Sequence, residues 1–266
     1  MPLRLEKPAR RIVTLAPHLA EMVFAAGAGD RLVGVVDYST YPEEAKKIPR
    51  VGGYSHFDLE AIVALNPDLI VAWRSGNSPA HIEKLQKLGL PVYVSQPDQI
   101  EDIAQELLHL GALADTRTAA NAEAARLRAR LKALRDRYAS LARVRTFYQI
   151  WKQPLTTIGG KQIISSVIRL CGGENIFDSL EPLAANVTVE SVVAANPEVI
   201  IASGMDQSRP EWLDDWRRWA SIAAVEQNNL FFIDPDLIQR HTPRLLDGAE
   251  RLCEHLETAR SRRPGR

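Results

Sequence analysis

The chain has 266 residues, and its 33 Lys plus Arg balance 33 Asp plus Glu, so the formal net charge at pH 7 is zero. This balance argues against a nucleic-acid-binding protein, because neutralising phosphates requires a basic surplus or a basic stripe. No run approaches the roughly 18 apolar residues that span a bilayer, and residues 1–8 lack the apolar segment of a secretory signal. We therefore expect either a cytosolic protein or one whose signal has been removed.

The first part of the chain alternates short apolar runs, rich in β-branched residues, with helical segments. The predicted strands are 11–16, 32–36, 68–73 and 91–95. The predicted helices are 18–26, 59–65 and 82–88. Strands that alternate with helices in this way predict a parallel sheet covered on both faces.

A long segment without Gly or Pro interrupts this pattern between residues 112 and 153. Its apolar residues recur at spacings of four and three, which is typical of one stripe along a helix. They are Leu127, Leu131, Leu134, Tyr138 and Leu141. We predict a helix over 119–142, roughly 35 Å long, that joins a lobe of residues 1–118 to a lobe of residues 143–266.

The alternation of strands and helices then resumes. The predicted strands are 144–150, 199–202 and 230–233, and the predicted helices are 163–170, 212–219 and 243–256. Residues 59–72 return as residues 189–202, with Glu60 matched by Glu190. This internal repeat on either side of the long helix predicts an α/β fold of two Rossmann-like lobes joined by that helix.

The common enzyme motifs are incomplete in this chain. Residues 27–29 lack the third glycine of a dinucleotide loop, residues 159–161 lack most of a P-loop, and residues 53–56 lack the closing glycine of a nucleophile elbow. The histidines show no metal-ligand spacing. We expect no enzyme, no metal site and no catalytic cofactor. Cys171 and Cys253 fit no metal motif and are either two free thiols or one disulfide.

Aromatic side chains follow the carboxyl ends of strands in the first half of the chain. They are Tyr38, Tyr54 and Trp73. In open parallel sheets ligands bind at these ends, so the three rings could line an apolar cleft for a large flat ligand. The alternative is local packing, since Tyr and Trp are often half-buried.

Two further groups stand out in the second half. The spacing of Trp212, Trp216 and Trp219 is four and three, which indicates the buried face of a helix. Asp236 and Arg240 follow the strand that ends at residue 233. They could contact ligand amides or pair with each other.

A resemblance to a known family rests on four segments: 11–21 (RIVTLAPHLAE), 35–42 (VVDYSTYP), 65–74 (LNPDLIVAWR) and 170–177 (LCGGENIF). Together they resemble the periplasmic cobalamin-binding proteins of bacterial ABC importers. The Asn-Pro-Asp-Leu-Ile element is shared with siderophore-, haem- and metal-binding relatives. The aromatic set of Tyr38, Tyr54 and Trp73 points more narrowly to corrinoids.

The resemblance implies a periplasmic monomer, with its signal removed, that captures cobalamin. It implies delivery to an ABC permease dimer of the inner membrane, no partner nucleic acid and little hinge motion between the lobes. The alternative is a haem- or siderophore-binding protein on the same scaffold.

The resemblance also implies roles for individual residues. Contacts with the ligand are assigned to Tyr38, Tyr54, Trp73, Asp236 and Arg240, permease docking to Glu60 and Glu190, and a disulfide to Cys171 and Cys253. Two aromatic positions of the family are occupied here by Thr156 and Ala184. We expect Trp151 to substitute for them as a ligand contact.

Overall fold

The computed structural model describes residues 3, 5–204 and 208–264. The chain divides into two compact units. The first contains Met1–Pro97 and Glu101–Arg128, and the second contains Asp98–Ile100 and Ala129–Arg266. No helix within the described ranges is long and apolar enough to cross a membrane.

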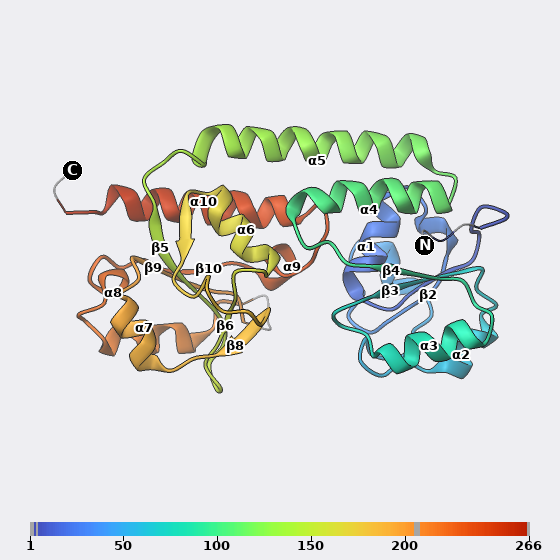
Figure 1. The fold of residues 1–266 in the computed structure, drawn as a ribbon, viewed down its shortest axis with the longest axis horizontal. Helices are drawn as coiled ribbons and strands as arrows, with labels where there is room; N and C mark the ends of the chain where they lie inside the picture. Colours follow the sequence, from blue (N-terminus) through green and yellow to red (C-terminus); the bar gives the residue numbers. More distant parts are fainter. Residues whose placement is uncertain (1–2, 4, 205–207, 265–266) are drawn as a thin grey trace. The chain divides into compact units, whose positions relative to one another are not determined.

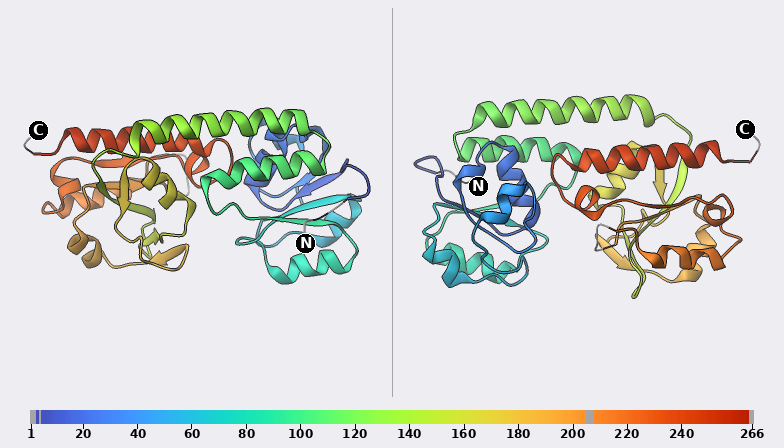
Figure 2. Two further views of the ribbon diagram at one scale, coloured as in Figure 1. Left: turned by 45° about the horizontal axis from the view of Figure 1, so that its top comes forward. Right: turned by 180° about the vertical axis from the view of Figure 1, so that it is seen from behind.

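The first unit is built on a parallel sheet in the order β2-β1-β3-β4. Its strands are β1 (Ile12–Thr14), β2 (Leu32–Val35), β3 (Leu69–Trp73) and β4 (Val92–Ser95). Its helices are α1 (Pro17–Ala25), α2 (Leu59–Ala64), α3 (Pro79–Lys87) and α4 (Ile100–Leu113), with short 3-10 turns at Gly29–Arg31 and Glu43–Lys47. Figures 1 and 2 show α2 and α3 on one face of the sheet and α1 and α4 on the other.

Helix α4 was not predicted from the sequence. Its buried residues Ile103, Leu107 and Leu110 are spaced by four and three, which is the signature of an amphipathic helix. Gly111 lies inside α4. An added Cβ at this position would overlap the Cβ of Ala120 on α5 (Arg117–Tyr138), so the contact between the two helices requires glycine here. This glycine therefore marks a close contact between α4 and α5.

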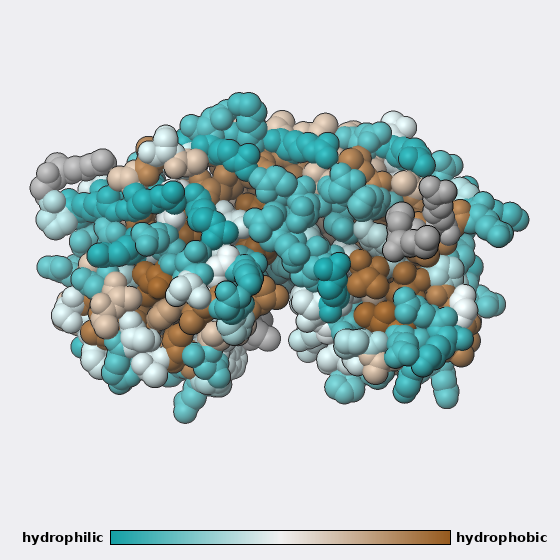
Figure 3. All heavy atoms as spheres, viewed as in Figure 1, coloured by the Kyte–Doolittle hydropathy of each residue, from teal (hydrophilic) through white to brown (hydrophobic). Residues whose placement is uncertain are grey.

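The long helix α5 spans Arg117–Tyr138 and ends four residues before the predicted boundary. The division between the two units falls within it, between Arg128 and Ala129. The stripe residues up to Tyr138 are buried as predicted, but Leu141 lies in the turn after the helix. The outer surface of α5 is mainly hydrophilic in Figure 3, as expected from its exposed Arg and Lys residues.

The second unit has a mixed sheet in the order β10-β9-β5-β6-β8, with β7 also paired to β5. Its strands are β5 (Val144–Trp151), β6 (Thr156–Ile158), β7 (Gly173–Asn175), β8 (Ala184–Asn186), β9 (Val199–Ala202) and β10 (Leu230–Phe232). The pairs of β5 with β6 and of β6 with β8 are antiparallel, and the others are parallel. Strands β6, β7 and β8 were not predicted, because three residues are too few to show a period.

The helices of this unit are α6 (Ile163–Leu170), α7 (Val189–Ala195), α8 (Ala223–Glu226), α9 (Pro235–Ile238) and α10 (Leu245–Ser261). Figure 1 shows α7 and α8 on one face of the sheet, with α6 and α10 on the other. The predicted helix over 212–219 is instead a 3-10 helix, η3 (Glu211–Arg218). Its tryptophans still face the core: Trp216 is buried, and Trp212 and Trp219 are partly buried against the same cluster.

The internal repeat has a structural basis in both units. The Asp68 carboxylate accepts hydrogen bonds from the backbone N–H groups of Arg10 and Arg11, just before β1. In the second unit, Glu198 accepts in the same way from Arg145 at the start of β5. The Asn-Pro-Asp/Glu element thus ends a helix, starts a strand and anchors the beginning of the neighbouring strand.

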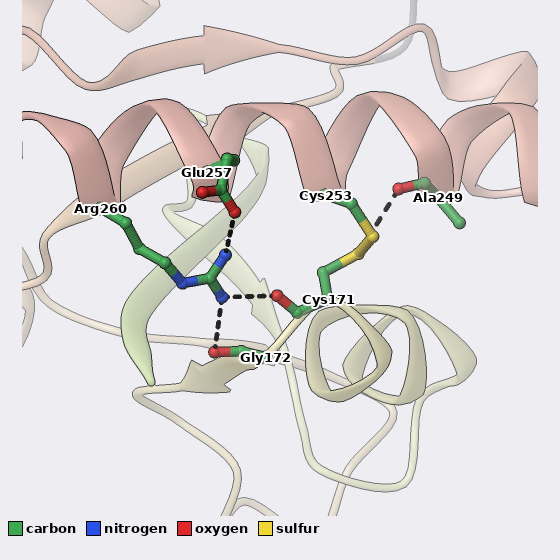
Figure 4. Close-up of a disulfide and its surroundings, with 6 residues drawn as sticks. All are labelled: Cys171, Gly172, Ala249, Cys253, Glu257 and Arg260. Carbon is green, nitrogen blue, oxygen red and sulfur yellow. Dashed lines mark hydrogen bonds and ion pairs between the residues drawn. A yellow bond between two sulfur atoms is a disulfide. The ribbon is translucent and has the colours of Figure 1, made fainter. Parts of the chain in front are cut away.

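The structure contains a disulfide between Cys171 and Cys253, which confirms the disulfide predicted from the family resemblance and excludes two free thiols. It joins the end of α6 to α10 (Figure 4). Next to it lies Arg260, whose side chain is almost fully buried. Its guanidinium donates to the carbonyls of Cys171 (2.7 Å), Gly172 (3.1 Å) and Ala142 (2.8 Å). The cation satisfies carbonyls at the end of α6 and in the turn after α5.

Candidate functional site

Trp73 ends β3 and begins a tight turn that Asn77 closes. The Asn77 side chain is 4% exposed. Its Oδ1 accepts from the Trp73 backbone N–H (2.6 Å), and its Nδ2 donates to the carbonyls of Leu15 (2.8 Å) and Tyr54 (2.7 Å). One buried amide therefore ties together the end of β3, the turn between β1 and α1, and the loop that carries Tyr54.

The Trp73 indole lies among three neighbours at this edge of the sheet. The ring of His18, from the first turn of α1, meets it edge-on at 5.0 Å between centroids. The Tyr54 ring is tilted against it at 6.2 Å. Gly76 supports the indole from the turn, because an added Cβ would overlap atoms of the six-membered ring. The structure thus brings Tyr54 and Trp73 into contact, an arrangement that fits both a ligand-binding cleft and local packing.

Tyr38 has an unusual backbone conformation for an aromatic residue. Its φ is 63°, in the left-handed region, and its side chain is 78% exposed. The Arg50 guanidinium donates to the carbonyls of Val36 and Ser39, on either side of Tyr38. Non-glycine residues held in this region of φ by their surroundings cluster at functional sites.

His18 and Asn77 were missed by reasoning from the sequence. Histidines taken singly are usually surface or cap residues, and Asn77 looks like a turn residue. The available signal was position: His18 directly follows a strand-closing proline, and Asn77 follows Trp73 by four residues. Neither pattern is specific without the tertiary structure.

Trp151 ends β5 in the second unit, with 42% of its surface exposed. It is paired directly with Thr156 across the antiparallel β5–β6 ladder. Thr156 hydrogen-bonds Asn186 on β8, and Ala184 lies exposed on the same strand. A register shift lies between Gln149 and Trp151, so the regular alternation of side chains between the two faces of the sheet is interrupted at this pair.

Asp236 and Arg240 form an ion pair at 2.7 Å with both side chains mostly buried. This is one of the two alternatives left open by the sequence. Asp236 lies in α9, and Arg240 follows that helix by two residues. The pair gives this part of the second unit one fixed carboxylate and one fixed guanidinium.

Buried polar groups adjoin this pair and were not predicted. The Gln239 side-chain amide donates to the Ser203 hydroxyl (2.6 Å) and the Gly204 carbonyl (3.1 Å), just after β9. Burial raises the pKa of the Tyr148 phenol, a shift opposed by Ser203 and Gln239. Burial lowers the pKa of His241 to about 4, against the opposing effect of the Asp98 carboxylate. His241 is therefore neutral at pH 7.

Two cavities, one in each unit, lie away from these residues. One of about 500 Å³ in the first unit is lined by the N-terminal residues Leu3 and Leu5 and by Tyr93 and His109. One of about 160 Å³ in the second unit is lined by Trp212, Trp216 and Trp219, next to Val189 at the start of α7. None of the predicted ligand contacts lines either cavity.

Glu60 and Glu190 occupy the first turns of α2 and α7, and both are exposed. The N-caps are supplied by other residues: Asp58 accepts from the N–H groups of Glu60 and Ala61, and Thr188 accepts from Ser191. No ion pair among the described residues involves either glutamate. Their carboxylates are therefore not needed to cap their own helices.

The comparisons with known proteins agree with this architecture. The model of the periplasmic binding protein family matches residues 12–237, and the chain belongs to this family. It is 38% identical over 256 residues to a vitamin B12-binding protein of Vibrio campbellii, covering 96% of this chain and 92% of that relative. A vitamin B12-binding protein of Yersinia pestis is 37% identical over 248 residues, covering 93% and 86%.

Solved structures extend the comparison. The crystal structure of the periplasmic vitamin B12 binding protein BtuF of Vibrio cholerae matches with a TM-score of 0.88 and 37% identity, covering 95% of this chain and 98% of that chain. The periplasmic heme-binding protein RhuT from Roseiflexus sp. RS-1 matches with a TM-score of 0.79 and 23% identity, covering 94% and 99%. The second likeness concerns the fold alone. The predicted fold of two lobes joined by a long helix is confirmed.

Proposed function

We propose that this protein captures cobalamin in the periplasm and delivers it to an ABC import permease, making and breaking no covalent bond. The observation that carries the proposal is the 38% identity to a vitamin B12-binding protein over 96% of the chain. That likeness includes both units, whereas the haem-binding RhuT is 23% identical on the same fold. The disulfide supports an oxidising compartment, where such bonds persist.

The ligand contacts proposed in the first unit are Tyr38, Tyr54 and Trp73. They supply large aromatic surfaces at the carboxyl edge of a parallel sheet, where ligands of open α/β sheets bind. Rings of this size suit the faces of a flat macrocycle.

In the second unit we propose contacts from Trp151, Asp236 and Arg240. Trp151 offers an exposed indole and pairs with Thr156 across the β5–β6 ladder. Its pairing with Thr156 supports Trp151 as the source of the aromatic surface that Thr156 lacks. The Asp236–Arg240 pair offers an acceptor and a donor for the amide groups around a corrin ring.

The binding test is a calorimetric titration with cyanocobalamin and, separately, with haemin. We expect a 1:1 complex with cyanocobalamin and a corrinoid visible spectrum that remains with the protein through gel filtration. Tighter binding of haemin would assign the protein to the haem-binding relatives. No heat with either ligand would contradict the proposal, and turnover of a bound ligand would point to an enzyme.

For docking we propose that Glu60 and Glu190 contact basic residues of the two identical halves of a permease dimer. The repeat gives each unit one exposed carboxylate at an equivalent helix start, and a homodimer presents each of its surfaces twice. Exposed complementary charges govern the orientation and rate of encounter more than affinity.

The docking test is the double variant Glu60→Arg with Glu190→Arg. We expect unchanged cobalamin affinity in the isolated protein and a collapse of transport in the reconstituted importer. A matched control reverses Glu83 and Glu174, which are also exposed. Normal transport by the Glu60 and Glu190 double variant would remove the docking role and leave the two glutamates as helix-start residues.

A further inference from the structure

The turn Trp73–Asn77 contains two residues that bear on ligand binding without being ligand contacts themselves. We propose that Gly76 and Asn77 are positioning residues that hold the Trp73 indole and the Tyr54 loop in their binding arrangement before the ligand arrives. This inference rests on the proposed function, because it takes Trp73 and Tyr54 as ligand contacts.

Asn77 connects three segments of the chain. Its side chain forms three hydrogen bonds to the backbone, to chain segments that lie as far as 62 residues away in the sequence. The orientation of the amide is determined by its partners, since the Trp73 N–H can only donate and the Leu15 and Tyr54 carbonyls can only accept. A buried amide with all these partners satisfied fixes one relative position of the three segments. Loss of the side chain would leave two carbonyls and one N–H without these partners.

Gly76 leaves free the space that the Trp73 ring occupies. The three atoms nearest to an added Cβ all belong to the Trp73 ring, and its Cδ2 would be only 2.6 Å away. The backbone of Gly76 lies outside the left-handed region, so alanine is compatible with its conformation. Glycine is therefore required at position 76 by the indole and not by the turn conformation, because the ring occupies the space that any side chain there would need.

Two other rings contact the Trp73 indole. His18 meets it edge-on and Tyr54 lies on another side. A methyl group at position 76 would displace the indole from between these neighbours. A preorganised ring lowers the ordering cost of binding, so displacement should appear as weaker affinity without loss of the fold.

The test is a double-mutant cycle in cyanocobalamin affinity with Gly76→Ala and Trp73→Ala. We expect each single variant to weaken binding by about 10- to 100-fold, the range for losing the burial of a large apolar group. In the Trp73→Ala background, Gly76→Ala should change the dissociation constant by less than about twofold, because its target is gone. Ser75→Ala, at an exposed position in the same turn, is the matched control and should bind normally.

Asn77→Ala tests the second residue by a different signal. We expect weaker binding together with faster amide hydrogen exchange in residues 52–57 and at Trp73, whereas Gly76→Ala should leave the exchange of residues 52–57 unchanged. Thermal unfolding of each variant reports whether the fold is intact. If Asn77→Ala does not fold, Asn77→Asp retains the acceptor for Trp73 and removes both donors, and the same exchange pattern is expected.

The outcomes separate this inference from the proposed function. If the unaltered protein binds no cobalamin, the proposed function fails and the positioning role fails with it. If it binds cobalamin but Gly76→Ala binds equally well, only the role of Gly76 is overturned. Additive losses from Gly76→Ala and Trp73→Ala would also overturn it, because they would show that Gly76 acts on something other than the indole.

Discussion

Replacing Arg260 with methionine should destabilise the second unit strongly. The Arg260 side chain is 1% exposed and donates to the carbonyls of Ala142, Cys171 and Gly172 and to the Glu257 carboxylate. Methionine retains much of the volume, so the cavity contribution is small. The loss comes from buried carbonyls deprived of a charged donor, at about 1–3 kcal/mol for each unsatisfied group.

The three carbonyls differ in burial, because Ala142 is at an exposed position whereas Cys171 and Gly172 are buried, so the loss is smaller than three full penalties. We therefore expect the free energy of unfolding to fall by about 3–5 kcal/mol, the range for breaking a buried charged interaction. Urea unfolding followed by circular dichroism measures this difference. Arg251→Met, at an exposed position on the same helix, is the control and should change stability by less than about 0.5 kcal/mol. A loss below about 1 kcal/mol for Arg260→Met would refute the assignment of Arg260 as the residue that satisfies these carbonyls.

Three further predictions follow from the structure. Replacing both Cys171 and Cys253 with alanine opens a loop with a sequence separation of 82. The free energy of unfolding should fall by about 4–5 kcal/mol on the chain-entropy estimate. Equal stability of the variant and the unaltered protein in urea unfolding would contradict this prediction. Because burial lowers the pKa of His241 to about 4, the unfolded chain binds the proton first as the pH falls below about 6.5. Between pH 7 and 4, the free energy of unfolding of the unaltered protein should therefore drop by up to about 3 kcal/mol more than that of His241→Phe. Parallel pH profiles of stability for the two proteins would refute this prediction. Tyr38→Gly should raise stability by about 0.5–1 kcal/mol by relieving the left-handed strain while weakening cobalamin binding; a Tm below that of the unaltered protein would show that Tyr38 is not strained.

Much of the fold was predictable from local sequence patterns. The strands 32–36 and 199–202 are continuous apolar runs, because a parallel strand covered on both faces must be apolar on both sides. The stripe of α5 was visible because a helix repeats every 3.6 residues, and the repeat of residues 59–72 predicted two related lobes. These features depend on residues that are close in the sequence.

Other elements escaped prediction for reasons that are also physical. Helix α4 contains Gly111, which usually lowers helix propensity but here allows contact with Ala120. Helix α5 ends at Tyr138 although the apolar pattern continues to Leu141, because the chain must turn into β5. The η3 segment keeps Trp216 buried although it is a 3-10 helix, whose period of three aligns Trp216 with Trp219 but not with Trp212.

The aromatic candidates were identified by sequence position alone, but only the tertiary structure decided how they are held. Asn77 reaches Leu15 across 62 residues, and Arg260 reaches Cys171 across 89. Such contacts depend on how separate elements pack, and no local pattern records them. The sequence by itself thus determined the order of strands and helices and the residue types at the strand ends. The tertiary structure decided which side chains meet, because the free energy of a buried polar contact depends on the partners that folding brings to it.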